Sequence, residues 1–237
     1  MRFDQIFISG LAGSRDGLPL PSHFPSRETR RLGGLGCLAL GCAEAAIGAA
    51  RLPPEILEHA ALAFGSDLGD IDQIARFLEV TRGPDAFQSA VHSAAPGELA
   101  RLLGIRGPQL VLSNGRASGA VAVLTGALAL INQRCSVCLC VAADLSGAVV
   151  ERALSAAGWP ADSFGAAAAA IVLETGSSLT TRGARGQAQL LSVAPHAAVG
   201  QPWKRRQSGA MDLCSLVDAL ERGEAAVSPT VFEVVRC

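Results

Sequence analysis

The chain alternates short, continuous apolar runs with longer segments in which apolar residues recur every three or four positions. The first kind is typical of strands covered on both faces, and the second of helices. We therefore predict strands at residues 3–9, 60–65, 109–113, 137–143, 166–174, 187–194 and 230–235 and helices at 30–50, 71–80, 94–103, 117–132, 149–157 and 211–221, with a loop at 10–26. The alternation of strands and helices predicts an α/β fold with a largely parallel sheet.

The predicted helix from Ala117 to Ile131 carries no charged residue on any face. A helix that is apolar all round must be buried all round. If several of its leucine, valine and isoleucine side chains stayed in water, the fold would forfeit about 1.5 to 3 kcal/mol for each. The pattern therefore predicts that a further layer or another chain covers this helix.

The composition indicates a globular protein with a sizeable core. Of the 237 residues, 49% are hydrophobic and 17% are charged, which is too apolar for a disordered chain. A net charge of −1 gives no general electrostatic reason to bind nucleic acid. The N-terminus lacks an apolar signal region, and the apolar uncharged stretch 117–133 is shorter than the roughly 20 residues of a membrane span. We expect a cytoplasmic protein without a membrane span.

After Pro195 the composition changes to a polar segment, followed by an amphipathic helical pattern and a short strand. We therefore assign residues 1–195 to one domain. Residues 196–237 are expected to form a loop, a helix and a short strand that pack on the same domain.

Seven cysteines are an odd number, and three of them, Cys135, Cys138 and Cys140, crowd into one apolar run. This usage favours reduced thiols in a cytosolic protein over a disulfide framework. A single Cys-x-x-Cys without a second pair is weak evidence for zinc, so no metal is expected. The glycine pattern at Gly34 and Gly36 follows an arginine run instead of a strand, so no dinucleotide cofactor is expected.

The segment from Gly107 to Ala120 predicts a short strand, a tight elbow and the start of an apolar helix. Arg116 falls at the start of that helix. A guanidinium at the positive end of a helix is disfavoured by roughly 0.3 to 1 kcal/mol unless an anion compensates it. Arg116 therefore needs a partner, for which Asp67 and Asp70 are the structural candidates.

This elbow and the segment from Phe87 to Gly97 resemble the N-terminal half of β-ketoacyl synthases. Further matches are Arg30-Arg31-Leu32, Phe64-Gly65-Ser66, Ala117-Ser118-Gly119 and Asp162-Ser163-Phe164-Gly165. The chain especially resembles the short ketoacyl-synthase-like proteins of aryl polyene and related polyketide or fatty acid pathways. The resemblance implies a thiolase-like half-domain with a mixed, mostly parallel five-stranded sheet flanked by helices.

In the family that it resembles, the elbow carries the nucleophilic cysteine, and Arg116 occupies that position here. A helix N-terminus lowers the pKa of a thiol, whereas an arginine cannot act as a nucleophile. The family's two general-base histidines, or a histidine and an asparagine, lie in a C-terminal half that we expect this chain to be too short to contain. We therefore predict no catalytic residue and a substrate-binding set of Ser113, Asn114, Gly115, Arg116, Ser118 and His92, although His92 also suits a simple packing role.

The resemblance leaves three hypotheses for function. The first is a non-catalytic partner of a β-ketoacyl synthase, similar in role to a chain length factor, present as a homodimer or as a heterodimer with the synthase. The second is an acyltransferase with altered chemistry, which transfers the acyl group from another thiol or uses Ser113 or Ser118. The third is a scaffold that binds acyl carrier protein, in which case Arg116 would face a phosphopantetheine phosphate or the acidic carrier.

Overall fold

The computed structural model describes residues 2–14, 23–29, 31–79, 83–158, 164–194, 210–223 and 231–237. Its strands are β1 (Arg2–Ser14), β2 (Ala61–Gly65), β3 (Gln109–Leu112), β4 (Val137–Asp144), β5 (Ala167–Thr175), β6 (Ala188–Val193) and β7 (Phe232–Arg236). Its helices are α1 (Ser26–Thr29), α2 (Gly33–Ala50), α3 (Pro54–Glu58), α4 (Ile71–Glu79), α5 (Pro84–Ala90), α6 (Ala94–Leu103), α7 (Ser118–Ile131), α8 (Ala148–Ala156), α9 (Gly176–Thr181) and α11 (Met211–Glu221). The α/β class is confirmed.

The strands form one sheet in the order β3-β2-β4-β5-β1-β6-β7. Only β2 runs parallel to its two neighbours, β3 and β4, while the other four pairings are antiparallel. The prediction of five strands in a mostly parallel sheet was therefore wrong in strand number and direction. A continuous apolar run indicates that both faces of a strand are buried. A strand can be buried in this way whether it runs parallel or antiparallel to its neighbours, so the pattern does not predict strand direction.

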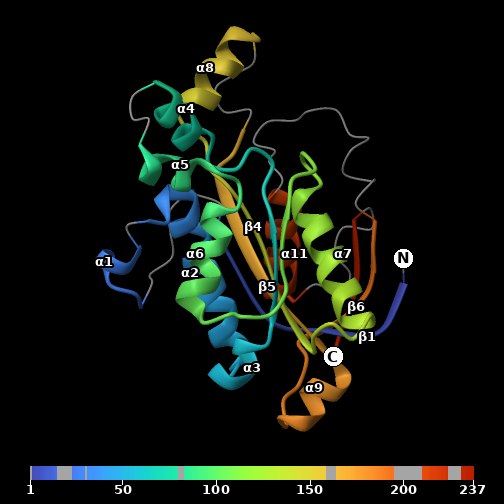
Figure 1. The fold of residues 1–237 in the computed structure, drawn as a ribbon. Coiled ribbons are helices and arrows are strands. Elements are labelled where there is room, and N and C mark those ends of the chain that lie inside the picture. The colour runs from blue at the N-terminus through green and yellow to red at the C-terminus, as the bar shows by residue number, and fades with distance from the viewer. Residues whose placement is uncertain are drawn as a thin grey trace.

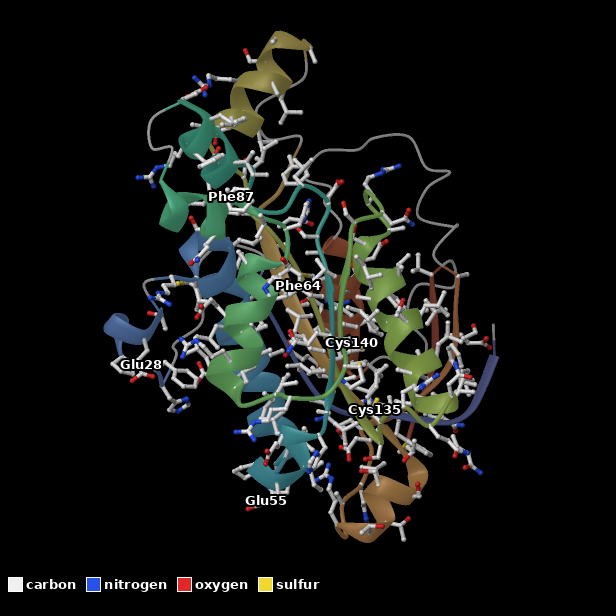
Figure 2. All side chains as sticks on the ribbon, in the orientation of Figure 1. Glu28, Glu55, Phe64, Phe87, Cys135 and Cys140 are labelled. Atoms are coloured by element: carbon white, nitrogen blue, oxygen red, sulfur yellow. The ribbon has the colours of Figure 1, made fainter. Side chains whose placement is uncertain are left out.

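Helices cover both faces of the sheet (Figure 1). On one face α2 and α6 pack over a core that includes Leu38, Leu99 and Phe64. On the other face α7 and α11 enclose a second core that includes Val123, Leu213 and Ile171. In Figure 2, Phe64 and Cys140 lie between these layers. The part of 196–237 that is described joins the same body, since α11 contacts β5 and β1 while β7 pairs with β6.

Strand β1 continues through residues 10–14, where we predicted a loop. The glycines that suggested the loop serve another purpose. A Cβ on Gly10 would lie 2.1 Å from the carbonyl oxygen of Ala46 and 2.7 Å from the backbone nitrogen of Ala50. Glycine therefore lets the backbones of β1 and α2 approach closely, and the sheet register shifts between Ile8 and Gly10 at the same point.

Helix α2 is long and apolar enough by composition to cross a membrane, but 56% of its 18-residue window is buried inside the fold. Its contacts with β1, β5 and β4 identify it as a core helix. Helix α7 is buried along one side only. Val121, Leu124 and Leu128 are half-buried, and Ile131 is 45% exposed, so the described part of the chain covers the uncharged helix incompletely.

The substitution Gly10→Ala is expected to lower the free energy of unfolding by about 1–3 kcal/mol, the usual cost of forcing an atom into a packed core. The added Cβ would collide with backbone atoms of Ala46 and Ala50. These atoms cannot rotate away as a flexible side chain could, so the backbone of α2 must move. Gly48→Ala is the matched control, since nothing lies within 4 Å of its added Cβ and alanine favours a helix interior by roughly 0.5–1 kcal/mol. Urea denaturation measures both, and equal effects of the two substitutions would contradict the close approach.

Candidate functional site

The elbow between β3 and α7 is a tight turn. Gly115 takes a positive φ of 55°, a conformation that suits glycine. The N–H groups of Ala117 and Ser118 donate to the carbonyls of Asn114 and Gly115. Arg116 therefore lies directly before Ala117, the N-cap residue of α7. This agrees with the predicted position of Arg116 at the start of the helix.

The Ser118 hydroxyl fixes the elbow from inside. It is fully buried, accepts a hydrogen bond from the N–H of Asn114 at 2.9 Å, and lies 2.6 Å from the Gly115 carbonyl and 3.1 Å from the Ser66 carbonyl. The last contact ties the elbow to the segment that follows β2. Ser118 was predicted to bind substrate, but in this structure its hydroxyl is directed at backbone groups.

The segment after β2 is held by Asp144, at the end of β4. The Ser66 hydroxyl and the Asp67 N–H donate to Oδ1 of Asp144 at 3.0 and 2.7 Å. The N–H of Ala210, at the start of α11, donates to Oδ2 at 2.8 Å. One buried carboxylate therefore connects β4, the β2–α4 segment and Ala210, the residue directly before α11.

Burial raises the pKa of Asp144 to about 7. The hydrogen bonds from Asp67, Ser66 and Ala210 act in the opposite direction, because they stabilise the ionised carboxylate. The nearby carboxylate of Asp67 raises the pKa further. Asp144 therefore changes charge close to neutral pH, although it has no exposure to solvent.

Arg116 acts electrostatically on two carboxylates, those of Asp67 and Asp212. Burial raises the pKa of Asp67 and of Asp212, and the positive charge of Arg116 lowers both. Asp67 was one of the two predicted partners. Asp212, in the first turn of α11, was not predicted as a partner of Arg116. It lies 96 positions away in the sequence, and the pattern of its helix does not indicate which element the helix packs against. These anions offset the unfavourable position of a guanidinium at the positive end of α7.

Asp70, the other predicted partner of Arg116, serves a different purpose. Burial raises the pKa of its carboxyl group, while the N–H groups of Gln73 and Leu35 lower it. Asp70 thus caps α4 and also reaches the first turn of α2. Arg76, not Arg116, is the cation that acts on it.

The remaining predicted site residues surround the same β2–α4 segment. Ser113 is exposed and donates from its hydroxyl to the Asp67 carbonyl at 3.0 Å, and Asn114 and Gly115 are exposed beside it. The His92 ring packs on Gly69, where an added Cβ would lie 2.6 Å from Cε1. The sequence thus identified residues that the fold gathers along one segment, but it did not identify Asp144, which holds that segment.

The cysteine run forms part of the core. Cys138 and Cys140 are buried, with their sulfurs 3.8 Å apart, and all seven cysteines are free. Burial raises the pKa of Cys135 to about 11, so its thiol is protonated at neutral pH. Within the described ranges, no group of three or more histidine, cysteine or acidic side chains is placed to hold a metal ion.

Residues 19–172 match the model of the β-ketoacyl synthase N-terminal domain. The chain belongs to the β-ketoacyl synthase family. The match includes the elbow, so Arg116 occupies a position inside the family domain. Among curated proteins, none matches the chain significantly.

Solved structures of β-ketoacyl synthases and their partners share this fold. A β-ketoacyl synthase from Burkholderia phymatum is 17% identical with a TM-score of 0.67, over 80% of this chain and 63% of that one. A complex of a ketosynthase (ApeO) with its chain length factor (ApeC) from Xenorhabdus doucetiae contains a chain that is 17% identical, with a TM-score of 0.68, over 99% of this chain and 100% of that one. A complex of a type II polyketide acyl-carrier protein with its ketosynthase contains a chain that is 19% identical. The match has a TM-score of 0.63 and covers 82% of this chain and 69% of that one. This β-ketoacyl synthase family member therefore spans 63% of the Burkholderia enzyme's length.

Ionisation of Asp144 is expected to make the fold less stable as pH rises. Its pKa is raised from 3.8 to about 7 by folding, so its contribution to stability is fully present below pH 4 and is lost as pH rises through 7. Each tenfold change in its acid constant corresponds to about 1.4 kcal/mol. Asp67, Asp70 and Asp212 are shifted in the same direction.

The substitution Asp144→Asn should flatten this dependence by removing one titrating group. The amide oxygen can still accept hydrogen bonds from Ser66 and Asp67, but the amide nitrogen faces the N–H of Ala210, and two donors cannot bond to each other. The variant is therefore expected to be less stable at every pH, and the quantity to compare is the slope of stability against pH. Unfolding free energies from urea titrations between pH 4.5 and 8 measure the slope. An unchanged slope in the variant would show that Asp144 does not titrate in this range.

Proposed function

We propose that this chain is a non-catalytic, β-ketoacyl synthase-like subunit that associates in the cytoplasm with a true β-ketoacyl synthase of fatty acid or polyketide biosynthesis, of the aryl polyene type. Its role would be that of a chain length factor. The proposal rests on Arg116, which the family resemblance assigns to the position of the nucleophile and whose charge lowers the pKa of Asp67 and of Asp212. A guanidinium cannot accept an acyl group at neutral pH.

The serines of the elbow do not favour an altered acyl transfer. Ser118 is fully buried and bonded to the elbow backbone, and Ser113 donates its proton to a carbonyl instead of to a base. An activated serine needs a base within hydrogen-bonding reach of its hydroxyl. Ser113, Asn114 and Gly115, with His92 beside Gly69, instead suit contacts with an acyl-carrying partner.

The two edges of the described sheet differ in a way that supports association. At one edge, β3 is uncharged, and Leu110 and Val111 are each 38% exposed. At the other edge, β7 exposes the charged Glu233 and Arg236. Charged side chains protect an edge from pairing, whereas an exposed apolar edge invites it.

Helix α7 contacts β3, and both elements are uncharged. We infer that the exposed side chains of the β3 edge and of α7 together form the apolar surface for the partner. The ketosynthase and chain length factor of Xenorhabdus doucetiae form a complex, which supports a synthase as the partner. A second copy of this chain would fit the same apolar surface and is an outcome that the experiment distinguishes.

The substitution Val111→Lys is expected to weaken association with the synthase at least tenfold, because an interface leaves a buried lysine without a partner. Val235→Lys is the matched control, since it places the same residue on the opposite edge at a position 50% exposed. The chain is co-expressed with a β-ketoacyl synthase of its own organism, and complexes are sized by light scattering. A stable monomer of the unmodified chain at low micromolar concentration would contradict the proposal, as would equal binding by both variants.

Incubation with malonyl- or acyl-carrier protein is expected to leave the intact mass of the chain unchanged. The variant Arg116→Cys is also expected to gain no acyl group, because the thiol would have two carboxylates as neighbours. The partner synthase serves as the positive control in the same mass spectrometry experiment. A stoichiometric adduct on the unmodified chain would replace this proposal with the acyltransferase hypothesis.

A further inference from the structure

A pocket of about 580 Å³ lies away from the elbow, at the junction of four helices. Gln73 of α4 and Gln88 and Ser89 of α5 form one side. The start of α2 and the first turns of α6 form the other side, with Arg31, Gly33, Ser93, Ala94, Gly97 and Glu98. The pocket thus lies between α4 and α5 on one side and α2 and α6 on the other, although α5 also contacts α6.

The helices on the outer side of this pocket bury little. Helix α4 has no buried side chain, and α8, which packs on α4, buries only Val150. The Phe77 and Phe87 rings join α4 to α5 with their centroids 5.6 Å apart, yet Phe87 is 55% exposed and Leu78 58%. In Figure 2, Phe87 is labelled on α5, close to α4. Elements with few buried apolar contacts open at a low free energy.

Polar helix caps, more than core packing, attach these helices. Asp70 accepts from the Gln73 N–H at 3.3 Å and also from the Leu35 N–H, so it links α4 to α2. Asp72 accepts from the Val149 N–H at 3.0 Å, so it links α4 to α8. Each cap of this kind is worth about 1 kcal/mol.

The chain between the body and α4 has a defined joint. Ser66 is fixed on the buried Asp144 and accepts the N–H of Gly69 at 2.9 Å. Gly69 itself has a positive φ of 64°, and Asp70 follows it directly. On the side of the body, the joint is held by the hydrogen bonds of Ser66 with Asp144 and Gly69. On the side of α4, it is held by the hydrogen bonds that Asp70 accepts.

From this arrangement we propose that α4, α5 and α8 form a lid that opens as one unit at the Gly69–Asp70 joint, at the segment 91–93 that joins α5 to α6, and at the segment 145–147, uncovering the polar pocket. The body formed by the sheet, α2, α6, α7 and α11 stays closed during this motion. The proposal is independent of the function proposed above, because it involves neither Arg116 nor the β3 edge.

Native-state hydrogen exchange of the unmodified chain at low denaturant tests the lid. Amides within residues 71–79, 84–90 and 148–156 are expected to share one opening free energy, below that of α2 and β4. Three different opening free energies for the three helices would overturn the proposal. A lid that exchanges only with the global unfolding of β4 would overturn it as well.

Variants at Asp70 test the joint. Asp70→Ala is expected to speed exchange of all three helices about fivefold, the factor that corresponds to the loss of one cap. Asp70→Asn is the matched control. Asparagine caps α4 as well as aspartate but offers one acceptor oxygen for the N–H groups of Gln73 and Leu35, so its exchange should lie between that of the unmodified chain and that of Asp70→Ala. Amides of β5 report that the body stays folded, and acceleration confined to α4 would show that the helices do not open together.

Discussion

The buried carboxylate of Asp144 is the contact on which the arrangement of the elbow depends. It accepts hydrogen bonds from Ser66, from the N–H of Asp67 and from the N–H of Ala210, so three segments distant in the sequence meet at one group. Ser66 in turn contacts Ser118 through its carbonyl, which fixes the start of α7. A buried polar group of this kind is stable only when its partners are complete, so the segments must take these positions together.

The same network divides the molecule into a firm part and a looser part. On its inner side lie the sheet and the helices that fill the two cores. On its outer side the chain continues into α4, which buries no side chain and is held by caps from Asp70 and Asp72. The contrast arises from sequence, because α4 is amphipathic and its apolar side is only partly buried against the small helices α5 and α8.

Local pattern was enough to predict the α/β class, the long uncharged helix and the elbow at Arg116, since each depends on residues close together in the sequence. Strand direction could not be predicted, because a run such as 137–143 is equally apolar in either direction. Asp144 and Asp212 were also missed. Asp144 follows an apolar run and Asp212 begins an ordinary amphipathic helix, and only the folded chain brings them to Ser66 and Arg116, 78 and 96 positions away.

The acidic surroundings of Arg116 give a physical reason to separate this elbow from a nucleophilic one. A thiol at the start of a helix becomes reactive when positive potential stabilises its thiolate. Here Asp67 and Asp212 lie close enough for the charge of Arg116 to lower the pKa of both. Without the arginine, these carboxylates would repel a thiolate and raise the pKa of a cysteine in its place. Arg116 and its acidic neighbours therefore form one electrostatic unit, and a cysteine placed at this position alone would not be activated as a nucleophile.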